Sequence, residues 1–194
     1  MIPTAISPFG LGFRRPYKQR LEYIESTGTQ YIDTGVKPDF AGGDSLEISF
    51  FRPTATEATS IFGSRTNSVT NGVYHIANNI NVCDADGYTG VSMTLAGNHT
   101  LSVSDTAIVN DATSYSMPRH VTTEFPVYLF ALNSGNRAIV NINGGKIYYW
   151  KYFQNNVLKQ YLIPVLAWND VPCMYDEITG ASLYNGGTGD FLYA

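Results

Sequence analysis

Residues 146–164 decide the fold, and they read KIYYWKYFQNNVLKQYLIP. Two runs of this stretch, Lys146–Phe153 and Val157–Pro164, are rich in the aromatic and β-branched residues that favour strands. Between them, Asn155 and Asn156 tolerate the positive φ that a two-residue hairpin turn requires. The stretch therefore predicts a β-hairpin. Both of its faces are largely apolar, which predicts a central place in a sheet covered on both sides.

The two-residue turn also predicts which residues face each other across the hairpin. In this register Trp150 lies opposite Tyr161, Lys151 lies opposite Gln160, and Tyr148 lies opposite Ile163. Because side chains alternate between the faces of a strand, Tyr148, Trp150 and Tyr152 share one face, which is expected to belong to the core.

Working outward, the rest of the chain also consists of short strand patterns. Ser45–Arg52 alternates Leu46, Ile48 and Phe50 with partners expected on the opposite face, and Val127–Leu132 is a continuous apolar run typical of a strand covered on both faces. Gly, Asn or Asp separates most of the other runs: Leu21–Glu25, Gln30–Thr34, Thr59–Gly63, Val73–Ala77, Ile80–Cys83, Val91–Leu95, Thr100–Val103 and Ala107–Asn110. No helix longer than a turn or so is expected. Together these patterns predict an all-β, two-sheet antiparallel sandwich.

Composition restricts the function. The 194 residues suit one domain, only 14% of them are charged, and the net charge of −4 carries no nucleic-acid signature. No run approaches the length of a membrane span, and the first residues lack the order of a secretory leader. Two cysteines, Cys83 and Cys173, are too few for a disulfide framework. Buried free thiols are the favoured interpretation, with a bridge between them left open.

Residues 1–20 differ from the rest and predict an extended N-terminal arm, followed by the domain in residues 21–194. Three prolines block helix in the arm, and four of the 12 basic residues fall there, while every acidic residue follows it. The arm cannot bury its own apolar residues, so we expect it to anchor the chain to an assembly; folding back over an edge strand is the alternative. The expected anchoring residues are Ile2, Ile6, Phe9, Leu11, Phe13, Arg14 and Arg15.

Two segments carry a family resemblance. Residues 21–35 read LEYIESTGTQYIDTG, and residues 174–191 contain MYDEITG followed by NGGTGDF. Both are similar to segments of concanavalin A-like and laminin-G-like jelly-roll domains in bacteriophage structural proteins and gut-bacterial surface proteins. The resemblance implies a jelly-roll sandwich whose first and last strands are neighbours. This would pair Gln30–Thr34 with Asp190–Tyr193.

Relatives of this fold include glycoside hydrolases, which need two carboxylates across the scissile bond. None of the six glutamates lies two residues from another acid, and the pair Asp84 and Asp86 falls in an expected turn. We therefore predict no enzymatic activity and no cofactor. The same turn has too few oxygen ligands for a calcium loop. The three histidines, His75, His99 and His120, do not share metal-ligand spacing.

Trp168, Asn169 and Asp170 are the candidate carbohydrate-binding residues. They precede Pro172 in an expected loop and combine a ring with an amide and a carboxylate. A Trp that covers the edge of the core is the simpler interpretation.

Two functions follow. The first is a non-enzymatic virion structural protein of a bacteriophage: a capsid decoration, head-fibre or tail component. It would be assembled in the host cytoplasm and bound to other virion proteins in many copies. The alternative is a carbohydrate-binding or adhesion module on a bacterial cell surface, with cell-surface glycans as partners. Neither nucleic acid nor a membrane is an expected partner.

Overall fold

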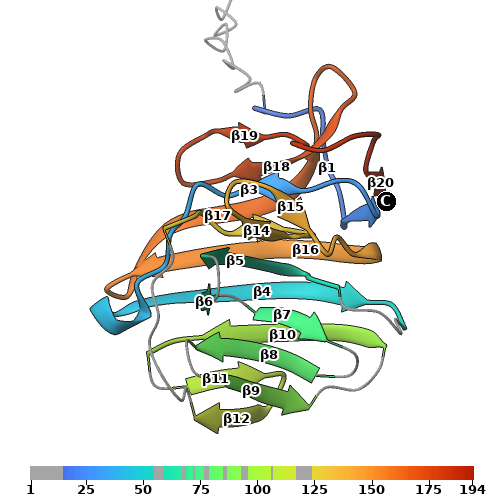
Figure 1. The fold of residues 1–194 in the computed structure, drawn as a ribbon. Helices are drawn as coiled ribbons and strands as arrows, with labels where there is room; N and C mark the ends of the chain where they lie inside the picture. Colours follow the sequence, from blue (N-terminus) through green and yellow to red (C-terminus); the bar gives the residue numbers. More distant parts are fainter. Residues whose placement is uncertain are drawn as a thin grey trace, which may run out of the picture.

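The protein is almost entirely β-structure. The computed structural model describes residues 15–54, 59–66, 69–71, 73–76, 79–84, 87–92, 96–105, 107–116 and 124–194, and of those between 69 and 92 it describes the backbone alone. Across these residues the strands form two facing layers (Figure 1). A short 3₁₀ turn, η1 (Phe40–Gly42), is the helical segment of the described chain. The predicted all-β sandwich is confirmed.

One layer is a single large sheet. Its strand order is β12 (Thr113–Ser116), β11 (Ala107–Asn110), β10 (Gly97–Val103), β4 (Asp44–Arg52), β16 (Asn143–Gln154), β17 (Val157–Leu166), β18 (Pro172–Asp176) and β19 (Ser182–Leu183). Three terminal strands join it: β1 (Gln19–Arg20) pairs with β17, β2 (Ile24–Thr27) pairs with β16, and β20 (Leu192–Tyr193) pairs with β2. All of these pairings are antiparallel.

The second layer holds two smaller sheets (Figure 1). The first runs β15 (Ala138–Ile139), β14 (Leu132–Ser134), β5 (Phe62–Thr66), β13 (Tyr128–Leu129) and β3 (Ile32–Asp33), with β6 (Val69–Asn71) on β5. The second is the meander β7 (Val73–Ile76), β8 (Asn79–Asp84) and β9 (Gly87–Ser92). One pairing of this layer, β14 with β5, is parallel.

The core lies between the two layers, where the predicted alternation places it. Leu46, Ile48 and Phe50 of β4 are buried, as is Trp150 of β16. Trp150 packs edge-on against Phe62 of β5, with ring centroids 5.5 Å apart. Its Nε1 donates to Oε1 of Gln160 at 3.0 Å. Central strands thus carry the largest buried rings.

The predicted hairpin is confirmed, but its predicted register is wrong. Asn155 and Asn156 have φ values of 50° and 63°, as a primed two-residue turn demands. An irregularity between Tyr152 and Phe153 then shifts the pairing. Trp150 therefore lies opposite Leu162, and Lys151 lies opposite Tyr161, one residue beyond the predicted partners. A β-bulge of this kind leaves an extra residue in one strand.

A second irregularity corrects the predicted core stripe. The pairing of β16 with β4 skips Tyr148, between Ile147 and Tyr149. Trp150 and Tyr152 do pack in the core, but so does Ile147. Tyr148 instead donates from its hydroxyl to Oδ1 of Asn98 at 2.8 Å, in an exposed hydrogen bond. The hairpin is central, yet only one of its faces is fully covered among the described residues.

The apolar run Val127–Leu132 is buried throughout, as predicted, but it is not one strand. Phe130 has a φ of 66°, which separates β13 from β14. The left-handed region is costly for a bulky residue. Phe130 is fully buried against Phe191, with ring centroids 5.1 Å apart. Packing of this ring is the visible compensation for the backbone conformation.

The beginning and the end of residues 21–194 meet, although not through the predicted strands. β20 pairs with β2 rather than with the segment Gln30–Thr34. That segment contributes β3 to the other layer, where it pairs with β13. It reaches the C-terminal loop through the side chain of Gln30 and an isolated bridge between Ile32 and Asn185. The prediction of adjacent ends is correct, and the assignment of the partner strand is wrong.

Candidate functional site

The three candidate residues Trp168, Asn169 and Asp170 lie together in the turn that joins β17 to β18. Hydrogen bonds from Ala167 N to Val171 O and from Asp170 N to Ala167 O, both 3.0 Å, close this turn. Asp170 takes a φ of 62°, a conformation that Asp tolerates better than most residues. The Asn169 side chain accepts from Val171 N at 3.4 Å. The turn leaves Trp168 48% exposed.

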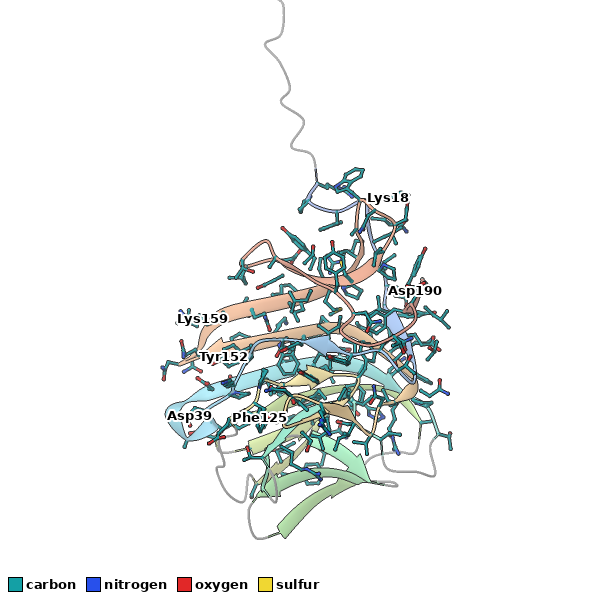
Figure 2. All side chains as sticks on the ribbon, turned by 45° about the horizontal axis from the view of Figure 1, so that its top comes forward. Lys18, Asp39, Phe125, Tyr152, Lys159 and Asp190 are labelled. Carbon is teal, nitrogen blue, oxygen red and sulfur yellow. The ribbon has the colours of Figure 1, made fainter. Side chains whose placement is uncertain are left out.

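The beginning of the described chain lies on this same turn. Trp168 Nε1 donates to the carbonyl oxygen of Arg15 at 3.1 Å. Lys18 forms an ion pair with Asp170 through its Nζ, and its backbone N donates to Leu166 O at 2.9 Å. Figure 2 shows Lys18 at one end of the molecule, where the chain enters the fold. The predicted carbohydrate-binding residues and the predicted anchoring arm therefore meet at one place.

An aromatic contact completes the site. The rings of Tyr17 and Tyr175 meet edge to face, with centroids 5.2 Å apart. Beneath them is a small apolar cluster on the outer side of the large sheet, made of Ile163, Val165, Ala167 and Cys173. We call Arg15, Tyr17, Lys18, Trp168, Asp170 and Tyr175 the root site. It fixes the segment that precedes β1 to the rim of the sandwich.

Cys173, in the cluster under the root site, is a buried free thiol, as the sequence favoured. Burial raises the pKa of Cys173 to about 11, so the thiol stays protonated at neutral pH. A protonated, buried thiol is a poor nucleophile. The side chain of Cys83 lies outside the described part of the structure.

The polar groups of the root site hold the N-terminal segment in place. The Trp168 indole N–H and the Asp170 carboxylate, which a sugar would need, are directed at the N-terminal segment. The side-chain carbonyl oxygen of Asn169 accepts a hydrogen bond within the turn. Of the predicted anchoring residues, Arg15 is exposed beside Trp168. Ile2, Ile6, Phe9, Leu11, Phe13 and Arg14 lie outside the described residues.

The other candidates do not assemble into a site within the described chain. His99 is buried on β10, with Nδ1 3.0 Å from Oδ2 of Asp111. Asp84 pairs with Gly87 across β8 and β9, while Asp86 and His120 are not described, nor is the side chain of His75. Among the described residues, no three His, Cys, Asp or Glu side chains cluster as metal ligands would. Within the same residues no helix is long and apolar enough to cross a membrane.

No family model, curated protein or solved structure matches this chain. The sandwich therefore rests on the structure itself. The jelly-roll family and the phage setting remain predictions from the two motif segments.

Sequence reasoning missed the partners of the root site. It named Trp168 and Asp170 as neighbours because they are contiguous, but it could not place Lys18 beside them, 152 residues away. One signal was present: Tyr17 follows Pro16 in the predicted arm. An extended segment with an aromatic residue at its end is suited to packing along a sheet.

Proposed function

We propose that this chain is a non-enzymatic structural protein of a bacteriophage virion, and that its N-terminal segment attaches it to another virion protein. The root site is the observation that carries the proposal. Strand pairing, an ion pair and ring contacts fix this segment to the sandwich. A partner bound to the segment would therefore hold the whole sandwich in place. The family resemblance of the two motif segments supplies the virion setting.

The direction of the segment supports attachment rather than fold-back. β1 runs antiparallel to β17, so the chain before Gln19 is directed past the Trp168 turn. Arg15 precedes Pro16, and a residue before proline favours extended backbone. The 14 residues before Arg15 can extend about 45 Å beyond the rim at ~3.3 Å per residue. They carry the five predicted apolar anchors and Arg14, which suit a partly apolar, acidic groove.

A second function is favoured by one observation, the half-exposed Trp168 ring. Exposed rings serve glycan recognition, so a carbohydrate-binding module of a bacterial surface is the alternative. The engaged indole N–H and Asp170 carboxylate weigh against it. Binding to a glycan array that is abolished by Trp168→Ala would favour the alternative over attachment.

Deletion of residues 1–14 tests the proposal, because it leaves the root site intact. The shortened chain should keep the melting temperature of the full chain and should no longer co-sediment with phage particles assembled without it. Replacing Arg14 and Arg15 by Glu should weaken attachment, most strongly at low salt. Arg137→Glu, an exposed charge reversal in the β14–β15 connection, is the matched control. Attachment that survives the deletion overturns the proposal.

A further inference from the structure

The outer face of the large sheet, opposite the core, is rich in aromatic rings. Strand pairing places Phe51, Lys146 and Glu25 in one row across β4, β16 and β2. A second row holds Glu47, Lys151 and Tyr161 across β4, β16 and β17. All of these side chains are partly exposed. We call this surface the tyrosine face, and its rings are Tyr23, Phe51, Tyr148, Tyr149 and Tyr161.

The two lysines of the tyrosine face are each neutralised by a glutamate. Lys151 Nζ lies 2.8 Å from Glu47 Oε1, and Lys146 Nζ lies 3.6 Å from Glu25 Oε2. Burial alone would raise the pKa of Glu47, but hydrogen bonds from Lys151 and Tyr149 and the charge of Lys151 hold it below the usual value. A hydrogen bond with Glu47 raises the pKa of Lys151. The Glu47–Lys151 pair is therefore ionised at neutral pH, and each lysine of this face is matched by one glutamate.

The rings of the tyrosine face are already held in place. Each lysine ammonium lies over a ring, Lys146 at 4.0 Å from the centroid of Tyr23 and Lys151 at 4.7 Å from that of Tyr149. Tyr149 also meets Tyr161 edge to face, with centroids 6.4 Å apart. Side chains that are ordered before binding lose less conformational freedom when a partner covers them.

We propose that the tyrosine face is a contact surface between two copies of this chain. In a two-fold contact the same patch meets itself, so a patch of one charge sign would repel its copy. The whole chain carries a net charge of −4, yet Glu25, Lys146, Glu47 and Lys151 on this face form two pairs of opposite charge. Tyr and Phe are also enriched in the buried centre of protein interfaces.

This inference does not depend on the N-terminal segment. The root site lies at the rim of the sheet, beyond β17, whereas the tyrosine face lies over β2, β4, β16 and the paired part of β17. A chain without residues 1–14 should therefore still pair with its copy. Particle attachment and self-association can fail separately.

Charge reversal on the tyrosine face tests the inference by mass measurement in solution. The wild-type chain should be a dimer at high micromolar concentration. Lys151→Glu makes the face negative and Glu47→Lys makes it positive, so either variant alone should dissociate at least about tenfold more readily, because like charges then confront each other. An equimolar mixture of the two variants should recover the dimer, and so should the double swap Glu47→Lys/Lys151→Glu.

Two controls keep the result unambiguous. Lys37→Glu makes the same charge change at an exposed position beyond β3 and should leave the dimer intact. Urea unfolding should show that each single variant folds, because a partly exposed ion pair contributes little to stability. A wild-type chain that is monomeric at high concentration overturns the inference, as does a dimer that neither single variant weakens. A dimer lost on deletion of residues 1–14 also overturns it and assigns the contact to that segment.

Discussion

The side-chain amide of Gln30 donates a hydrogen bond to the backbone carbonyl of Asp190, 160 residues further along the chain. The same Nε2 is 3.1 Å from the carbonyl of Thr188, and Oε1 accepts from Thr27 N at 2.8 Å. Gln30 is 1% exposed, and its hydrogen bonds to these backbone groups are partly buried. One buried side chain thus joins the opening segment to the closing loop.

Gln30→Ala should lower the free energy of unfolding by about 1–3 kcal/mol, because the partly buried backbone groups that Gln30 holds lose their partner. Urea denaturation monitored by fluorescence measures the change. Gln154→Ala, an exposed glutamine at the end of β16, is the matched control and should change stability by less than about 0.5 kcal/mol. Equal effects at both positions would contradict this account.

Gly187→Ala should destabilise the protein by contact alone. A Cβ at Gly187 would lie 2.0 Å from the carbonyl oxygen of Thr29, and no backbone atom there is free to move alone. Gly135→Ala provides the comparison, since its Cβ would meet nothing within 4 Å and only its φ of 64° opposes substitution, at about 1–2 kcal/mol. Melting curves of both variants decide the matter. Gly187→Ala should be the less stable of the two.

The hairpin turn offers a stabilising substitution. Asn156 has a φ of 63°, and Asn-Gly is the preferred pair for a primed turn. Asn156→Gly should therefore raise stability by about 0.5 kcal/mol, whereas Asn156→Val should lower it by about 1–2 kcal/mol. A stabilising valine would show that the turn does not need a left-handed residue. Thermal unfolding of the three chains measures the order.

Stability should fall at high pH because of Tyr128. Burial, and then the charge of Asp33, raise the pKa of Tyr128 from 10.0 to about 12. The folded chain thus holds this proton more tightly than the unfolded chain. This tighter proton binding contributes fully to the free energy of unfolding below pH 10, and the contribution is lost as the pH rises toward 12. Urea unfolding between these limits should show a smaller decline for Tyr128→Phe than for the wild type; an identical decline would exclude Tyr128 as a cause.

Local sequence patterns predicted the strands, whereas the irregularities within and between the strands depend on tertiary packing. The alternation in Ser45–Arg52 and the Asn155-Asn156 turn depend on neighbouring residues, so both were predicted correctly. The bulge at Tyr148 and the positive φ of Phe130 arise where packed strands must bend or separate. No spacing in the sequence encodes these irregularities: the first places Tyr148 outside the core, and the second divides the buried run Val127–Leu132 into two strands.

The same distinction applies to the candidate sites. Trp168 and Asp170 were predicted together because they share a turn, while their partners Arg15 and Lys18 come from the opposite end of the chain. The tyrosine face was hidden for a different reason. With Tyr148 assigned to the core, β16 reads as apolar on both faces, and the pairing of Lys151 with Glu47 requires the observed strand order.

The two strands of the hairpin separate beyond Trp150 and Leu162, and this separation affects the order in which the chain can fold during synthesis. β16 and β17 pair only near their turn, and beyond Trp150 and Leu162 their neighbours are β2 and β1, with β20 on β2. β1 and β2 thus wait for partners that lie much later in the sequence, in β16, β17 and β20. Such long-range closure slows folding. A prematurely terminated chain would keep β2 without β20 and Gln30 without the carbonyls of the closing loop. Its exposed strand edges would mark it for chaperones and proteases.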